Sequence, residues 1–186
     1  TYSHTYSASG AHKIKLTGLA TDYSDAATDA AVSFSSDAHR ISKISGSLGK
    51  IFPTLPDGSQ PRFNQTFYYA NNLTEIPADL FAGIQGAPAE YMFSYTFFNA
   101  AITEIPDGLF AGIQGAPAEG MFQFTFGFTP ITEIPADLFA GIQGAPADSM
   151  FMGTFSSTDI TEIPADLFAG IQGAPAGGMF DATFSV

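Results

Sequence analysis

Apolar and polar positions follow one another along most of the chain in a pattern that returns every 29 residues. The run ITEIPADLFAGIQGAPA at 131–147 stands again, letter for letter, at 160–176, and near-copies occupy 73–89 and 102–118. The twelve residues after each copy drift, but they keep a Met-Phe pair and a Thr-Phe pair. A fixed period of this length is typical of a solenoid, in which each unit covers the apolar face of its neighbour.

Each unit is predicted to contain a strand and two helical segments. Residues 73–76 (LTEI) form the expected β segment, with Leu73 and Ile76 turned inward. Pro77 suits the first turn of a helix, and Gly86 lies where that helical stretch ends. The unit therefore combines a strand on one side with helical turns on the other.

A second helix is expected to begin at Pro88 and to carry both the fixed and the drifting residues. Met92, Phe93, Thr96 and Phe97 have the i, i+1, i+4 and i+5 spacing that places side chains on one face of a helix. We expect that face to pack on the next unit. The drifting positions then lie on the opposite face, toward solvent.

The pattern defines the predicted boundaries. Residues 41–72 form a degraded first copy that suits a capping unit, and residues 1–40 form an N-terminal β segment or cap. In the latter, Tyr6, Ile14 and Leu16 alternate as in a half-buried strand. The repeat region is 41–186, with units near 41–72, 73–101, 102–130, 131–159 and 160–186.

The pattern LTEIPADLF…MFxxTF…ITEIP resembles the BspA-like class of leucine-rich repeats, which occurs in bacterial surface proteins and adhesins. This resemblance covers about 41–186. It implies an α/β solenoid, a right-handed leucine-rich-repeat-like coil of about five 29-residue units, and an extracellular or cell-surface location. The family usually has Cys or Asn shortly after the second Phe, where this chain has Asn99, Phe128, Ser157 and Val186. Residues 4–18 are similar to the last hairpin of a PKD-like or immunoglobulin-like module.

The distribution of charged residues limits the classes of partner that the protein can bind. All six basic residues lie in 1–62, whereas 63–186 carry 13 acidic residues and no Lys or Arg, for a net charge of −12 over the chain. Such a surface repels nucleic acid and anionic lipid. Hydrophobic content of 45% argues against disorder, and no apolar run is long enough to span a membrane. Cysteine is absent, so thiol chemistry and thiolate metal sites are excluded.

Three sets of polar residues recur with the 29-residue period and are candidates for chemistry or for structural ladders. Glu75 and its equivalents form a ladder of carboxylates, but identical units give them one environment, whereas acid–base catalysis needs two. We therefore predict that the protein is not an enzyme and has no cofactor; a weak Ca²⁺ site between carboxylates is left open. Recurring Gln and Thr side chains are expected to form internal hydrogen-bonded ladders. They are Gln85, Gln114, Gln143 and Gln172, and Thr96, Thr125, Thr154 and Thr183.

The drifting face is the predicted binding site, since it concentrates aromatic residues in the first units and loses them in the last. Large exposed aromatic side chains usually mark a contact surface. The expected ligand-binding residues are Tyr68, Tyr69, Tyr91, Tyr95, Phe98, Phe124, Phe128 and Met152. The predicted role is extracellular recognition or adhesion toward a protein, a peptide or a neutral glycan. A phage tail-fibre tip on the virion surface and a structural, self-assembling surface element are the alternatives.

The last unit ends at Val186 without a polar cap, and its outer side is expected to expose core-like apolar surface. We interpret the chain as a fragment or processed product. Self-association through this unit is the competing explanation.

Overall fold

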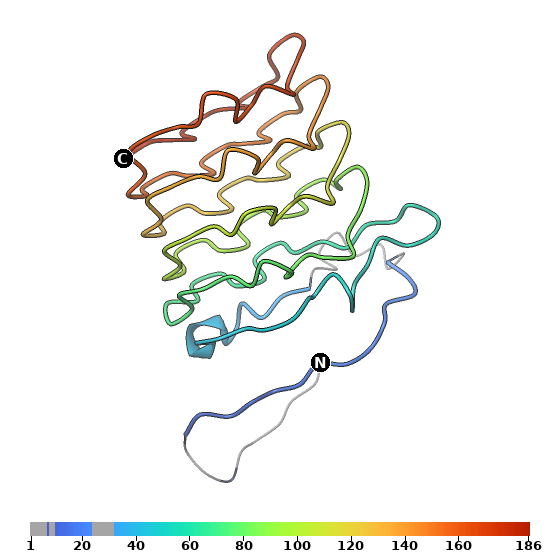
Figure 1. The fold of residues 1–186 in the computed structure, drawn as a ribbon, viewed down its shortest axis with the longest axis vertical. Helices are drawn as coiled ribbons and strands as arrows, with labels where there is room; N and C mark the ends of the chain where they lie inside the picture. Colours follow the sequence, from blue (N-terminus) through green and yellow to red (C-terminus); the bar gives the residue numbers. More distant parts are fainter. Residues whose placement is uncertain (1–6, 8–9, 24–31) are drawn as a thin grey trace.

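The protein was analysed as a computed structural model, which describes residue 7, residues 10–23 and residues 32–186. The repeats stack on one another as a pile of similar layers, one for each 29-residue unit (Figure 1). Within the described residues, the 3-10 helix η1 (Ala38–Arg40) is the one helical element, and no strand is present. Three isolated parallel bridges join neighbouring layers: Gly86 to Ile113, Gly115 to Ile142 and Gly144 to Ile171.

The predicted α/β solenoid is therefore wrong. The described part of the chain contains neither the strand expected at 73–76 nor the helix expected after Pro88, and the isolated bridges do not form a sheet. Consecutive turns replace both elements. Because this fold class is not observed, the structure gives no support to the predicted leucine-rich-repeat and adhesin descriptions.

Hydrogen bonding explains how turns build a regular layer. In the drifting stretch, which we call the variable side (residues 90–101 and their equivalents), backbone N–H groups alternate between two kinds of acceptor. Ser94 N–H donates to the Tyr91 carbonyl at 3.1 Å, three residues back, whereas Phe93 N–H donates to the Met121 carbonyl at 2.9 Å, in the next layer. The first kind closes a turn, and the second joins one layer to the next.

Every fourth residue of this ribbon adopts a left-handed backbone conformation. In one layer Tyr91, Tyr95 and Asn99 have φ values of 54°, 54° and 53°. A right-handed helix has no such residues, since its φ values stay near −63°. The four-residue spacing of the Met-Phe and Thr-Phe pairs therefore comes from a repeating turn and not from a helical face.

Phenylalanine rings form the core in three columns that run through the stack. Along each column the rings are nearly parallel; those of Phe93 and Phe122, for example, lie 5.7 Å apart with an interplanar angle of 9°. Rings from the constant side (residues 73–89 and their equivalents) lie between the two variable-side columns, as Phe110 does at 4.9 Å from Phe122. The columns are Phe63, Phe93, Phe122, Phe151 and Phe180; Phe67, Phe97, Phe126, Phe155 and Phe184; and Phe81, Phe110, Phe139 and Phe168.

The predicted threonine ladder is confirmed. Thr125 is fully buried, and its Oγ1 donates to the Phe93 carbonyl of the preceding layer at 2.8 Å. Thr154 and Thr183 make the equivalent bonds to Phe122 and Phe151. Each hydroxyl thus has a backbone acceptor inside the core, where an unpaired polar group is costly.

The predicted internal glutamine ladder is wrong. The side chains of Gln85, Gln114, Gln143 and Gln172 are all exposed. Backbone groups join the layers at this point instead, with Gln114 N–H donating to the Gly86 carbonyl at 2.8 Å.

The first layer is covered by an extended segment. Val32 N–H donates to the Arg62 carbonyl at 2.8 Å, and Phe34 N–H donates to the Thr66 carbonyl at 3.0 Å. The Phe34 ring lies 5.8 Å from that of Phe67, so it continues one of the ring columns past the first layer. Residues 32–34 therefore close the N-terminal end of the core.

The predicted N-terminal strand is wrong where the structure describes it. Residues 10–23 contain no strand, and Ile14 is 70% exposed. Tyr6 lies outside the described residues. The segment is held to the first layers farther on, where Ala20 N–H donates to the Ile51 carbonyl at 2.7 Å.

Candidate recognition surface

Six of the eight predicted site residues form one connected group of rings on the variable side. Phe98 lies at the centre, and its ring contacts that of every other member. Tyr68 stacks on Phe98 at 5.3 Å, and Tyr95 stacks on Phe124 at 5.1 Å. We call this group the aromatic surface: Tyr68, Tyr69, Tyr95, Phe98, Phe124 and Phe128.

The aromatic surface is open to solvent at two points. Tyr69 is 43% exposed and Phe128 is 48% exposed, and they contact Phe98 from the layers before and after its own. Tyr95 and Phe124 are half-buried, because they stack on each other. A ligand would therefore touch Tyr69 and Phe128 first.

Backbone conformation makes this placement of aromatic residues unusual. Tyr69, Tyr95, Phe124 and Phe128 all occupy left-handed positions, with φ between 50° and 60°. Residues with a Cβ are disfavoured there by about 1–2 kcal/mol, whereas glycine is not. The layer after Phe124 has Gly153 at the equivalent place, with φ 59°. The first layers thus keep large rings at positions where local backbone energetics favour glycine.

Tyr91 and Met152 lie apart from the ring group. The Tyr91 hydroxyl donates to Glu119 Oε1 in the next layer. Its ring covers Gly120, where an added Cβ would come within 2.4 Å of the Tyr91 ring. Met152 Sδ accepts a hydrogen bond from Gln123 Nε2 at 3.3 Å. Both residues are half-buried and bridge adjacent layers.

Several tyrosines are expected to ionise late in an alkaline titration. Burial raises the pKa of Tyr23 to about 12, and burial also raises the pKa of Tyr95 and, with the neighbouring Tyr69, that of Tyr68. The hydrogen bond to Glu119 raises the pKa of Tyr91. Because the pKa of these tyrosines is higher in the folded state than in the unfolded state, they stabilise the fold at pH values below their unfolded-state pKa. This contribution is lost as the pH rises toward the folded-state pKa. Stability should therefore fall between about pH 10 and pH 12.

Ultraviolet absorbance of phenolate, followed against pH, would check this. We expect an early group of tyrosines and a delayed group, and Tyr95→Phe should remove one proton from the delayed group. A single transition at the ordinary tyrosine pKa would contradict the burial described above.

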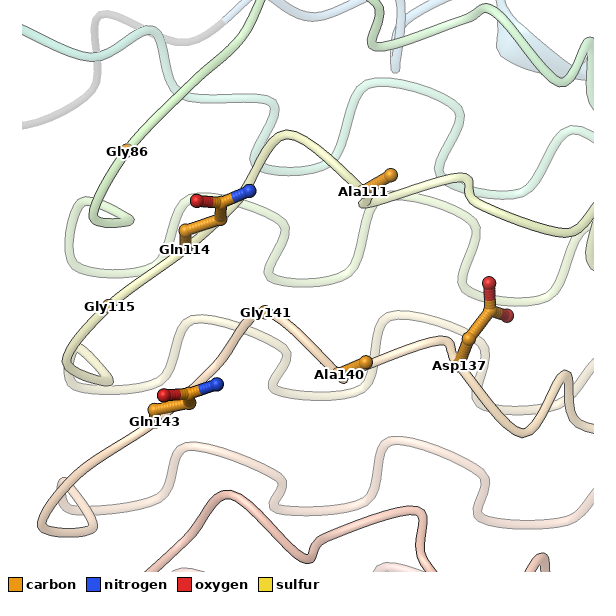
Figure 2. Close-up of a pocket in the computed structure, with 8 residues that line it drawn as sticks. All are labelled: Gly86, Ala111, Gln114, Gly115, Asp137, Ala140, Gly141 and Gln143. Carbon is orange, nitrogen blue, oxygen red and sulfur yellow. The ribbon is translucent and has the colours of Figure 1, made fainter.

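The constant side has a different character. An open groove of about 760 Å³ is lined by small residues of three successive layers together with Gln114, Gln143 and Asp137 (Figure 2). The labelled glutamines repeat from one layer to the next and do not converge on a common point (Figure 2). The ladder carboxylates of Glu75, Glu104, Glu133 and Glu162 are exposed.

Within the described residues, no group of three or more His, Asp or Glu side chains is arranged to hold a metal ion. His4, one of the three histidines, lies outside those residues. No helix in the described part of the chain is long and apolar enough to cross a membrane.

Comparison with known proteins returned no relative: no family model, no curated protein and no solved structure matches the chain.

Proposed function

We propose that the protein is an extracellular recognition module that binds a protein or peptide segment through the aromatic surface. The observation that carries the proposal is the placement of Tyr69, Tyr95, Phe124 and Phe128 at left-handed positions. Their rings cluster on one side of the stack, and two of them are more than 40% exposed. Packing of the core does not require this, because the later layers stack on the same Phe columns with Gly153 and Ser157 at equivalent positions.

The shape of the surface favours a polypeptide over a small molecule. The aromatic surface lies along the outside of several layers, whereas the open grooves lined by Gln114, Gln143 and Gln172 lie on the constant side. Small-molecule sites are usually concave pockets, whereas exposed aromatic residues are enriched where proteins meet. A polypeptide can cover Tyr69 and Phe128 together, two layers apart.

Charge favours a basic partner. Residues 63–186 carry 13 acidic residues and no Lys or Arg, so this part of the chain attracts cationic chains and repels anionic ones. Lys and Arg side chains also bind over the faces of Tyr and Phe rings. The proposed partner segment is therefore rich in Lys or Arg and contains apolar residues.

A random peptide library displayed on phage and selected on the full chain would test this. We expect enriched peptides to be basic and partly apolar. The double variant Tyr69→Ala, Phe128→Ala should bind them at least about tenfold more weakly, or about 1.4 kcal/mol. Both side chains are exposed, so the melting temperature should change little.

The matched control is the double variant Gln114→Ala, Gln143→Ala on the constant side, which should bind the same peptides as the parent does. Loss of binding in this control with retention in the aromatic variant would move the site to the groove of Figure 2. Absence of any enriched peptide, together with binding to neutral sugars on a glycan array, would replace the polypeptide by a glycan.

A further inference from the structure

The two most exposed rings of the aromatic surface occupy the same position in layers that are not neighbours. Tyr69, Asn99 and Phe128 are equivalent residues of three successive layers, since the N–H of each donates to a carbonyl of the layer that follows. All three have a left-handed backbone, with φ values of 59°, 53° and 60°. We call these three residues the corner row. Along the stack the row reads aromatic, amide, aromatic.

Backbone hydrogen bonds between the layers determine the spacing of the corner row. Chains joined by such bonds lie about 4.8 Å apart, so Tyr69 and Phe128 are separated by about 9.6 Å along the stack. The ring of Phe98 lies between them, with its centroid 5.8 Å from that of Tyr69 and 5.1 Å from that of Phe128. A partner that contacts both exposed rings must therefore present two apolar groups at this interval.

Regular polypeptide conformations present side chains at different intervals. A polyproline II helix has about three residues per turn and a rise of about 3.1 Å, so residues i and i+3 point the same way about 9.3 Å apart. Alternate residues of a β-strand lie about 6.7 Å apart. Residues i and i+7 of an α-helix lie about 10.5 Å apart. Polyproline II therefore matches the interval of the exposed rings most closely.

The residue between the two rings suits the same kind of backbone. Asn99 is half-buried, and its side chain makes no hydrogen bond to the part of the chain that the structure describes. A polyproline II segment has no internal hydrogen bonds, so its carbonyl groups are free to accept, whereas those of an α-helix are used within the helix. The Asn99 amide is thus placed to donate to a peptide carbonyl between the two ring contacts.

Charge near the corner row favours basic residues in the bound segment. Glu75, Glu104 and Glu133 follow the three corner residues by six, five and five positions, and all three are exposed. Residues 63–186 contain no Lys or Arg that would neutralise them. A basic side chain in each turn of the bound segment would be attracted to this row of carboxylates.

We infer that the corner row binds a basic, proline-containing segment in the polyproline II conformation. Apolar residues at every third position of the segment contact Tyr69 and Phe128, and a carbonyl between them accepts from Asn99. Proline favours this conformation because its ring fixes φ near −65°, so little backbone freedom is lost on binding. The inference rests on the proposed function and specifies the conformation and composition of its partner.

Fluorescence anisotropy of two labelled peptides, measured with the full chain, would test the inference. The first peptide consists of four repeats of Leu-Pro-Arg and has an apolar residue at every third position. The second has alanine in place of every proline, with the same charge and the same leucine spacing. We expect the proline peptide to bind at least about tenfold more tightly, because its backbone is already restricted before binding.

Exchanging two corner residues tests the spacing of the rings. Asn99→Phe combined with Phe128→Asn keeps the number of corner rings but places them in adjacent layers, about 4.8 Å apart. We expect this variant to bind the proline peptide at least about tenfold more weakly.

A glycine substitution tests the amide. Asn99→Gly removes the donor at a backbone position that glycine adopts freely, and it should weaken binding of the proline peptide about threefold or more. Ser157→Gly is the matched control. Ser157 is the exposed equivalent in the layer after Phe128, with φ 52°, and its substitution should leave the affinity unchanged.

Equal affinity for the two peptides would overturn the inference, and this comparison needs no variant to fold. Unchanged binding by the exchange variant would overturn it as well. If the proline peptide fails to bind while peptides selected from the random library still require Tyr69 and Phe128, the proposed function stands with a partner of another conformation. If the selected peptides also fail to bind through these two rings, the proposed function is overturned together with the inference.

Discussion

Replacing Phe122 with alanine is expected to lower the free energy of unfolding by about 4 kcal/mol. The side chain is fully buried and contacts rings of its own column and of the constant-side column. Its ring is 5.7 Å from Phe93 and 5.8 Å from Phe151 along its own column, and 4.9 Å from Phe110 and 4.6 Å from Phe139 on the constant side. Truncation removes all four ring contacts and leaves a cavity between rigid layers.

Urea denaturation followed by circular dichroism would measure this change. Phe128→Ala is the control, because it removes the same side chain from a site that is 48% exposed, and it should cost less than about 1 kcal/mol. Equal costs for the two substitutions would mean that the columns do not carry the stability of the stack.

Replacing Gly141 with alanine is expected to destabilise the protein by about 3 kcal/mol. A Cβ at this position would lie 2.1 Å from the Ile113 carbonyl oxygen of the preceding layer. The obstacle is backbone, so it cannot turn away as a flexible side chain could. Gly112 and Gly170 face the same obstacle, at 2.0 Å from Ile84 O and 2.2 Å from Ile142 O.

Thermal melting of Gly141→Ala beside Ala140→Ser would separate a steric cause from a general sensitivity of this stretch. Ala140 is the adjacent residue and is exposed, so its substitution should leave the melting temperature nearly unchanged. Similar melting temperatures for the two variants would show that the layers can move apart without cost.

The sequence was informative about which side chains face inward. The period correctly placed Met92, Phe93, Thr96 and Phe97 in the core, where each is 0% exposed. It also placed the Thr side chains where hydroxyls donate to core carbonyls. These predictions depend on repetition and burial, which remain the same whether the backbone between the core residues is helical or not.

The backbone itself was predicted wrongly because a four-residue spacing fits two structures. An i, i+4 pair lies on one face of a helix, and it also lies on one side of a ribbon that turns every four residues. Glycines gave the signal that separates the two. Gly120, Gly153 and Gly178 recur at the left-handed positions of the ribbon, and residues of that conformation do not occur inside helices.

For the candidate site, the sequence identified the residues but not their arrangement. Tyr69 and Phe128 are exposed, as their drifting positions predicted, but the stacking of Tyr95 on Phe124 depends on the left-handed backbone. Ser94 drifts between units and was expected outside, yet it is only 1% exposed. Sequence variation among the layers therefore does not map strictly onto solvent exposure.

On the variable side, a row of hydrogen bonds runs from N–H groups of one layer to carbonyl groups of the next, as from Phe93 to Met121 and from Phe151 to Met179, and this row makes the stack electrically polar. Each peptide unit carries a dipole of about 3.5 D, and bonds that all point the same way add their dipoles along the pile. The negative, carbonyl end lies at the first layers and the positive, N–H end at the last. The protein's fixed charges are segregated in the compensating sense: its six basic residues all precede Phe63, and its acidic residues predominate in every layer after it. The order of charges along the sequence therefore opposes the dipole of the stack.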